Sequence, residues 1–390
     1  MNEFHLLFLL LPIAAFSGWY VARRGSERTS GARVSELSSN YFRGLNYLLN
    51  EEQDKAIEVF LKLAEYNRDT VETHLALGNL FRRRGEVDRA IRVHQNLIAR
   101  PTLSDEEKTV ALLELGEDYM RAGLLDRAET LFTDLVAMNA LAPSALTHLV
   151  SIYQHERDWA KAIDHATKLE AATGESQGAI IAQFHCERAE LARSRGAADE
   201  ARACLDEALE AEEDCIRASM ILGHIEAAEG NYEAAIAAYE HVAEREVDYV
   251  PEILSLLLDC YAKAQTMQRA EEFLLQIIDR HQGVSPVLAL ARLYARTKGE
   301  EVAIEFLTRQ LRQRPSVRAL MALIDANLHF AKDDARESLL IQRDLTRKLL
   351  EGQAMYRCSH CGFGAKAHHW QCPSCKNWST VRPIHSVVGE

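Results

Sequence analysis

One alanine recurs along most of the chain at a nearly constant interval, and this spacing constrains the fold more than any other feature. Successive copies lie roughly 34 residues apart, with longer intervals after the second and the fourth copy. A small residue lies twelve positions before six of these alanines, Val150 and Leu258 hold that position in two weaker copies, and a bulky residue often follows the alanine by four positions. The alanines are Ala56, Ala90, Ala128, Ala162, Ala201, Ala235, Ala270 and Ala303. Eight copies in register argue against a set of independent globular domains and predict one repeat array.

Each copy predicts two helices that pack closely. The small residue on the first helix and the alanine on the second allow close approach, and the bulky residues fill the gaps. The clearest copies include Gly78 with Ala90, and Gly116 with Phe132. The period resembles that of the tetratricopeptide repeat, a helix-turn-helix unit of about 34 residues. The resemblance implies an all-α fold, in which an α-solenoid winds as a right-handed superhelix around an extended concave surface.

We assign residues 36–351 to this array, as about eight repeats followed by a degenerate capping repeat. Residues 316–351 keep apolar residues at helical spacing, although the alanine frame fades there. The frame's aromatic and small residues are expected to serve packing. Binding is expected on the polar positions of the first helices. Asn79 matches one position of the carboxylate clamp found in some tetratricopeptide proteins, but Leu75 stands at the neighbouring clamp position and disfavours that subtype.

A transmembrane anchor is predicted for residues 1–22. Residues 4–22 are uncharged, and this stretch is long enough for one membrane-spanning helix. Arginines follow at once, at Arg23, Arg24 and Arg28, whereas no Lys or Arg precedes the stretch. The positive-inside rule therefore puts the bulk of the protein in the cytoplasm. A cleaved signal peptide and a buried helix of a soluble protein fit less well, and residues 23–35 read as a juxtamembrane linker.

Four cysteines near the C-terminus predict a metal site within a module of residues 352–390. They form two Cys-x-x-Cys pairs with ten positions between them: Cys358, Cys361, Cys372 and Cys375. Four thiolates complete a closed tetrahedral site, and its usual occupant is Zn²⁺. Because so short a segment builds only a small core, we expect the metal to supply much of its folding free energy, on the order of 10 kcal/mol.

The cysteine pairs resemble the knuckles of rubredoxins and zinc ribbons. Gly362 follows the first pair, but Lys376 follows the second where rubredoxin has glycine, so zinc is favoured over iron. Three histidines could replace a cysteine ligand: His360, His368 and His369. Three aromatic residues are expected to cover the metal or pack on the last helices: Phe363, Trp370 and Trp378. Four further cysteines lack metal spacing and are expected to be buried: Cys186, Cys204, Cys215 and Cys260.

Catalysis and nucleic-acid binding find little support in the sequence. Common nucleotide-binding and hydrolase motifs are absent, and we predict that the protein is not an enzyme and has no catalytic residues. The formal charge of −13 opposes wrapping of DNA or RNA. A redox carrier and a nucleic-acid-binding zinc ribbon remain as alternatives, which iron colour and salt-dependent binding would reveal.

The order of anchor, repeat array and cysteine module resembles the lipopolysaccharide assembly protein B family of Gram-negative bacteria over the whole chain. The resemblance implies an inner-membrane adaptor that modulates lipopolysaccharide synthesis. Its partners would be the deacetylase that commits precursors to lipid A and the membrane-bound AAA+ protease that degrades it. Homo-oligomerisation is left open. A general membrane-tethered scaffold for another envelope process is the alternative. We further expect the array to bind protein clients and the metal module to dock on the array.

Overall fold

The computed structural model describes residues 41–47, 49, 50, 52–66 and 70–390. The predicted anchor (1–22) and linker (23–35) lie outside these residues. No helix within the described part of the chain is long and apolar enough to cross a membrane.

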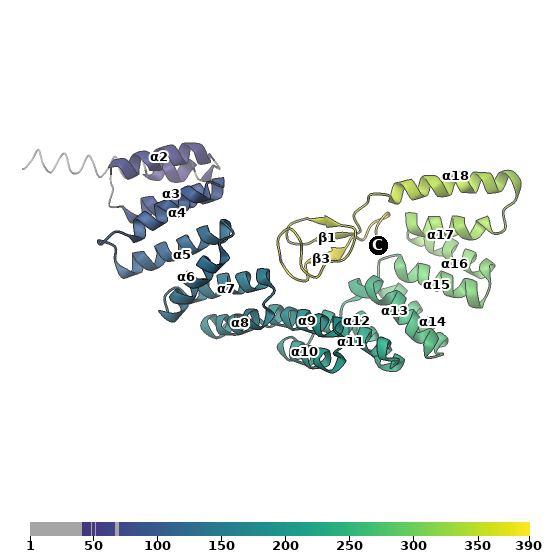
Figure 1. The fold of residues 1–390 in the computed structure, drawn as a ribbon. Helices are drawn as coiled ribbons and strands as arrows, with labels where there is room; N and C mark the ends of the chain where they lie inside the picture. Colours follow the sequence, from purple (N-terminus) through teal and green to yellow (C-terminus); the bar gives the residue numbers. More distant parts are fainter. Residues whose placement is uncertain (1–40, 48, 51, 67–69) are drawn as a thin grey trace, which may run out of the picture. The chain divides into compact units, whose positions relative to one another are not determined.

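The described chain is helical up to residue 350 and forms two compact units (Figure 1). Unit 1 runs to Asp158 and includes Ala171–Thr173, and unit 2 comprises Trp159–Glu170 and Gly174–Glu390. Residues 41–47 of unit 1 are helical. They are followed by α2 (Gln53–Tyr66), α3 (Val71–Arg84), α4 (Val87–Ile98), α5 (Asp105–Arg121), α6 (Leu125–Ala137) and α7 (Ala142–Glu156).

Unit 2 contains the remaining helices and a small sheet. Its helices are α8 (Trp159–Thr173), α9 (Gly178–Ser194), α10 (Ala198–Ala211), α11 (Ile216–Glu229), α12 (Tyr232–Arg245), the 3-10 helix η1 (Val247–Tyr249), α13 (Val250–Lys263), α14 (Met267–Arg280), α15 (Ser285–Thr297), α16 (Glu300–Gln313), α17 (Val317–Leu328) and α18 (Asp333–Leu350). The metal module forms an antiparallel sheet in the order β2-β1-β3, from β1 (Tyr356–Cys358), β2 (Gly364–Ala365) and β3 (Val381–Pro383). The boundary between units falls inside the predicted fourth repeat, so the superhelical path across it stays a prediction.

The repeat frame explains the packing of neighbouring helices. Every frame alanine lies on an even-numbered helix and is at most 2% exposed. Gly116 on α5 lies against Phe132 on α6, so closely that an added Cβ would come within 2.5 Å of the ring. Gly223 on α11 meets Tyr239 on α12 in the same way. The small residue is therefore required by the aromatic side chain opposite it.

Turn residues end the helices where the frame places glycine. Gly85 has φ of 86° and donates its N–H to the end of α3, and Gly230 closes α11 in the same left-handed conformation. Glycine adopts this conformation without steric cost. The insertion after α4 contains Ser104, which forms a capping box with Glu107 at the start of α5. Local chemistry therefore fixes the C-terminal ends of α3 and α11 and the start of α5.

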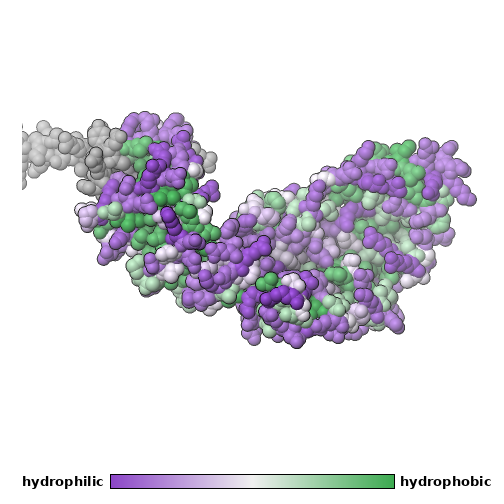
Figure 2. Space-filling model, viewed as in Figure 1, coloured by the Kyte–Doolittle hydropathy of each residue, from purple (hydrophilic) through white to green (hydrophobic). Residues whose placement is uncertain are grey.

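The final helix differs from the others in its exposure. Within α18, Thr346 is the buried residue, whereas Ile341, Leu345 and Leu349 are between 57% and 59% exposed. Figure 2 shows hydrophobic surface over this end of unit 2, on a face that is otherwise mostly hydrophilic. A capping repeat normally presents a polar outer face. The helix pair α17 and α18 departs from that pattern.

Candidate metal centre and its docking face

The structure brings the four predicted cysteines together. Their sulfur atoms all lie within 4.8 Å of one another. Across the two knuckles, Cys358 Sγ is 3.7 Å from Cys375 Sγ, and Cys361 Sγ is 3.7 Å from Cys372 Sγ. Cys358 and Cys372 are buried and Cys361 is exposed, so the group lies at the surface of the module.

These distances fit a tetrahedral metal site. Metal–sulfur bonds of about 2.3 Å give a tetrahedron whose sulfur–sulfur edges are about 3.8 Å, close to the two distances of 3.7 Å. Disulfides need about 2.05 Å, so the sulfurs are too far apart for that bond. Cys358 Sγ also lies 3.3 Å from the hydroxyl oxygen of Thr380. The donor set indicates one metal ion held by four sulfurs, and both zinc and iron accept such a set.

The two knuckles share one backbone geometry. Gly362 has φ of 76° and donates its N–H to Cys358 O at 3.0 Å. Lys376 has φ of 61° and donates its N–H to Cys372 O at 2.9 Å. Lysine thus takes the left-handed conformation that glycine takes in the other knuckle. The departure from the rubredoxin pattern is accommodated by backbone strain and leaves the loop intact.

Replacing Lys376 by glycine is expected to stabilise the module. Glycine removes about 1–2 kcal/mol of left-handed strain and adds about 0.5–1 kcal/mol of unfolded-state entropy, so we expect a net gain of roughly 0.5–1 kcal/mol. Metal transfer to a chromophoric chelator should be slower than in the wild type. The exposed Lys366, whose φ is not positive, provides the control, because Lys366→Gly carries only the entropic cost. Faster metal loss from Lys376→Gly would contradict this account.

The neighbouring histidines are not part of the sulfur group. Among the described residues, the clustered metal-ligating atoms here come from the four cysteines, and His360, His368 and His369 lie outside the cluster. The His368 ring packs against Tyr249, Tyr356 and Trp370 at centroid distances of 5.4, 5.8 and 4.6 Å. Burial lowers the pKa of His368 to about 4. At neutral pH the ring is therefore uncharged and acts as an aromatic packing group.

The two module tryptophans pack on the middle of the array, and the expectation that they contact the last helices is wrong. Trp378 lies edge-on to Trp159 of α8 and Phe184 of α9, at centroid distances of 6.5 and 6.2 Å. Trp370 stacks on Tyr249 of η1 at 5.1 Å, with 18° between the rings. Apolar ring surface on both sides drives this contact. Phe363 behaves as expected and packs beside Cys358 and Cys372.

Arg217 of α11 lies under both tryptophans. Its guanidinium carbon is 5.7 Å from the Trp370 ring centre and 5.6 Å from that of Trp378. The residue is 6% exposed and pairs with Glu187 Oε1 on α9 at 2.7 Å. A desolvated guanidinium over two indole faces is a strong cation–π arrangement. Arg217 therefore links two first helices of the array to the metal module.

Polar contacts extend this docking toward α13. The Arg382 guanidinium pairs with Glu246 at 3.0 Å, and His385 Nε2 lies 3.0 Å from the Asp248 carboxylate. The Tyr356 hydroxyl donates a hydrogen bond to Glu252. We call the residues of α8, α9, α11, η1, α13, α15 and α17 that contact the module, together with Glu246, the docking face. Figure 1 shows the module's strands beside these helices. The expectation that the module docks on the array is therefore met within unit 2.

Sequence reasoning missed the array side of this interface. Arg217, Glu246 and Glu252 hold ordinary polar positions on or beside repeat helices, and no spacing marks them. The four cysteines outside the module are buried, as expected. Cys186 and Cys215 lie 29 positions apart in sequence, yet their sulfurs are 3.7 Å apart. Such proximities come from tertiary packing and have no local sequence signal.

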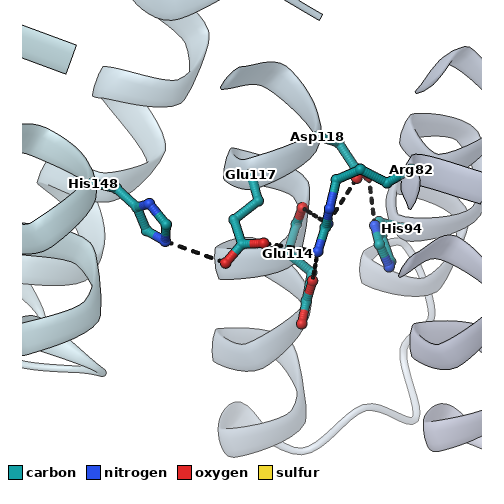
Figure 3. Close-up of polar contacts among 6 residues, drawn as sticks. All are labelled: Arg82, His94, Glu114, Glu117, Asp118 and His148. Atoms are coloured by element: carbon teal, nitrogen blue, oxygen red, sulfur yellow. Dashed lines mark hydrogen bonds and ion pairs between the residues drawn. The ribbon is translucent and has the colours of Figure 1, made fainter. Parts of the chain in front are cut away.

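A second polar cluster lies in unit 1, and Figure 3 shows its six residues. They come from the helices α3, α4, α5 and α7 and are Arg82, His94, Glu114, Glu117, Asp118 and His148. Arg82 pairs with three carboxylates, at 2.7 Å from Glu114, 2.7 Å from Glu117 and 2.8 Å from Asp118. A hydrogen bond from His148 lowers the pKa of Glu117 and outweighs the opposite effect of burial. The cluster ties neighbouring first helices together.

The cluster contains a buried pair that resembles part of a catalytic triad. His94 Nδ1 lies 2.6 Å from Asp118 Oδ2, and both side chains are 0% exposed. An added Cβ on Gly78 would fall 2.2 Å from His94 Nε2, so backbone blocks the ring's other edge. A triad needs a nucleophile at that edge. The pair therefore has a packing role, with His94 in the place that Phe132 and Tyr239 hold in other repeats.

Comparisons with known proteins agree with this architecture. The family model described as the rubredoxin metal binding domain matches residues 356–383. Tetratricopeptide repeat models match residues 73–108, 113–176 and 186–248. The all-α tetratricopeptide solenoid and the small metal-binding module are thus confirmed. Neither family description names a catalytic domain.

Two curated relatives are similar over nearly their full length. Lipopolysaccharide assembly protein B of Escherichia coli (strain K12) is 39% identical over 385 residues, which cover 98% of this chain and 99% of that protein. Lipopolysaccharide assembly protein B of Haemophilus influenzae is 36% identical over 391 residues, covering 97% of this chain and 98% of that protein. These matches span the array and the metal module together.

Proposed function

The chain belongs to the lipopolysaccharide assembly protein B family, and from this premise we propose that it is an adaptor that modulates lipopolysaccharide synthesis. The near full-length identity to the Escherichia coli protein carries the proposal. In the proposed mechanism, the array binds the deacetylase that commits precursors to lipid A synthesis. It brings this deacetylase to a membrane-bound AAA+ protease. Regulated degradation of the deacetylase then limits synthesis. This mechanism follows from the family resemblance and needs no catalytic group in the chain.

The structure supports a binding role for the array. Polar side chains on first helices contribute to the docking face in unit 2 and to the Arg82 cluster in unit 1. Concave surfaces built from such helices are the usual binding surfaces of solenoid proteins. A tethered surface also raises the effective concentration of its partners. We propose that residues 1–22 provide the tether in the inner membrane and that the rest of the chain faces the cytoplasm.

We propose that the metal site is structural and holds zinc. The four residues that would hold the ion are Cys358, Cys361, Cys372 and Cys375. Bound there, the ion would cross-link the two knuckles, and four thiolates leave no coordination position for water or substrate. The chain's own contribution is to present the aromatic and charged residues of the module to the docking face. The site thereby supports the binding surface without chemistry of its own.

Photo-crosslinking from the full-length protein in cells tests the adaptor proposal. A photoreactive residue replaces Ser151, which is exposed on the first helix α7. We expect mass spectrometry to recover the deacetylase and the protease, and depletion of the chain to raise the cellular level of the deacetylase. The same residue at exposed Thr133 on the second helix α6 is the control. Recovery of neither partner, with other envelope proteins crosslinked, would favour the general scaffold.

A further inference from the structure

A cavity in unit 2 opens between first helices of consecutive repeats. Its volume is about 310 Å³, and residues of α13, α15 and α17 line it together with Met267 of α14. Apolar side chains form one part of the lining, among them Leu254, Leu258, Leu288 and Leu293. The cavity lies beside the segment of the module that ends at Glu390. None of the four metal-site cysteines lines it. Its shape offers room for one or two partner side chains.

Cationic groups dominate the charge around this cavity. Its lining includes Arg292, Arg296 and Arg318, against the single carboxylate of Asp259 among the lining residues. Arg292 and Arg296 are exposed and lie one turn apart on α15. Within the described chain, neither forms an ion pair or a side-chain hydrogen bond. Arg292 follows the frame's small residue directly, as Asn79 does on α3, which places it on the first-helix binding surface.

One edge of the cavity already binds a carboxylate, which belongs to Glu390 of the same chain. The Glu390 carboxylate accepts hydrogen bonds from the Ser285 N–H at 3.0 Å and the Ser285 hydroxyl at 2.5 Å, and it pairs with Arg318. Burial raises the pKa of Glu390, but the Ser285 and Arg318 contacts outweigh this and hold it below its ordinary value. The Val317 N–H also donates to Val387 O at 2.8 Å. Side-chain and backbone contacts together bind a non-helical segment there through the single carboxylate side chain of Glu390.

We propose that the rest of this cavity binds an acidic segment of a protein partner. One apolar side chain of the segment enters between α13 and α15, and its carboxylates pair with Arg292 and Arg296. Charge complementarity and the internal example of Glu390 support this occupant. The backbone contact to Val387 favours a peptide over a lipid headgroup. The inference rests on the proposed adaptor function and adds the chemistry of the client segment.

Peptide binding to the full-length protein in detergent tests the inference. The probe is a fluorescein-labelled octapeptide of sequence Glu-Asp-Leu-Glu-Glu-Leu-Asp-Glu, measured by fluorescence anisotropy. We expect the double variant Arg292→Glu/Arg296→Glu to weaken binding at least tenfold, because attraction becomes repulsion. The matched control Arg312→Glu/Lys348→Glu changes net charge equally at exposed positions on α16 and α18 and should alter binding less than twofold.

Three further arms make the test specific. Ser255 is exposed on α13 and lines the cavity, so Ser255→Trp should occlude it and weaken binding while every arginine remains. A peptide with serine in place of both leucines should bind at least fivefold more weakly. Equal binding by that peptide, or by the Arg292→Glu/Arg296→Glu protein, would overturn the inference. Competition by phosphatidylglycerol vesicles that depends on the same arginines would assign the cavity to lipid instead and would also overturn it.

Failure of this inference can be told apart from failure of the adaptor proposal. If crosslinking recovers the deacetylase and the protease but the octapeptide does not bind, the inference fails and the adaptor proposal stands. If the octapeptide binds through Arg292 and Arg296 but neither partner is recovered, the adaptor proposal fails. In that case the acidic-segment site stands as a property of the cavity alone.

Discussion

Replacing Cys358 and Cys361 by serine is expected to remove the bound metal and unfold the metal module. Two of the four sulfurs are lost, and serine hydroxyls are poor zinc ligands at neutral pH. Metal binding supplies on the order of 10 kcal/mol of folding free energy in modules of this size. We therefore expect metal analysis of the purified full-length protein to fall from one zinc per chain to none, with loss of the deacetylase-lowering activity proposed above.

Tryptophan fluorescence should report the undocking directly. Three of the four tryptophans in the chain lie at or beside the interface, namely Trp159, Trp370 and Trp378. Their emission should shift to longer wavelength as the rings become solvated. The helical far-UV signal should change little, because the array's own helix contacts remain. Cys204→Ser/Cys260→Ser, which alters two buried cysteines outside the module, is the control and should keep its metal. Full activity of the Cys358→Ser/Cys361→Ser variant without metal would refute the prediction.

Periodic and local patterns in the sequence predicted their structures well. The alanine frame required only that the small residue of a first helix face the second helix of the same pair, which the contact of Gly116 with Phe132 reflects. The spacing of the cysteines likewise encoded the sulfur cluster, because each Cys-x-x-Cys loop is a local turn. In both cases the interacting residues are close in sequence, so pattern and contact coincide.

The docking of the module could not be predicted in the same way. Trp378 meets Trp159, which lies in the first half of the chain, and nothing in the spacing of either residue marks that contact. Arg217 is indistinguishable in sequence from other helix arginines, yet it is buried under two indole rings. The sequence therefore placed the aromatics over the metal or on the last helices, whereas in the structure the two tryptophans pack on α8, α9 and η1. Contacts between residues far apart in the sequence therefore determine where the module docks.

His94 shows a third limit of prediction from the sequence. The frame expects a bulky residue four positions after Ala90, and a histidine stands there. In the structure its ring fills that packing position and is 0% exposed. A polar ring can occupy the position because Asp118, on the next repeat, accepts a hydrogen bond from it at 2.6 Å. Arg82 in turn balances the buried carboxylate of Asp118.

Replacing Arg82 by methionine is expected to destabilise unit 1 strongly. Methionine keeps much of the apolar volume of the arginine stem but removes the charge that pairs with Glu114, Glu117 and Asp118. Asp118 is 0% exposed, so its carboxylate would keep only His94 as a partner. Leaving one member of a buried ion pair without its partner costs about 3–5 kcal/mol. We expect a loss of this size in the local stability of α3 and α5.

Hydrogen exchange resolved to peptides of α3 and α5 measures this loss, because those amides report local opening of unit 1. A destabilisation of about 3 kcal/mol or more accelerates exchange by roughly 100-fold or more. Arg83→Met is the matched control, since Arg83 is exposed on the same helix and should change exchange little. Adding Asp118→Asn to Arg82→Met removes the buried charge while retaining a hydrogen-bond partner for His94, so protection should partly return. Equal exchange in the Arg82→Met and Arg83→Met proteins would show that the three carboxylates do not depend on Arg82 and that solvent stabilises the cluster instead.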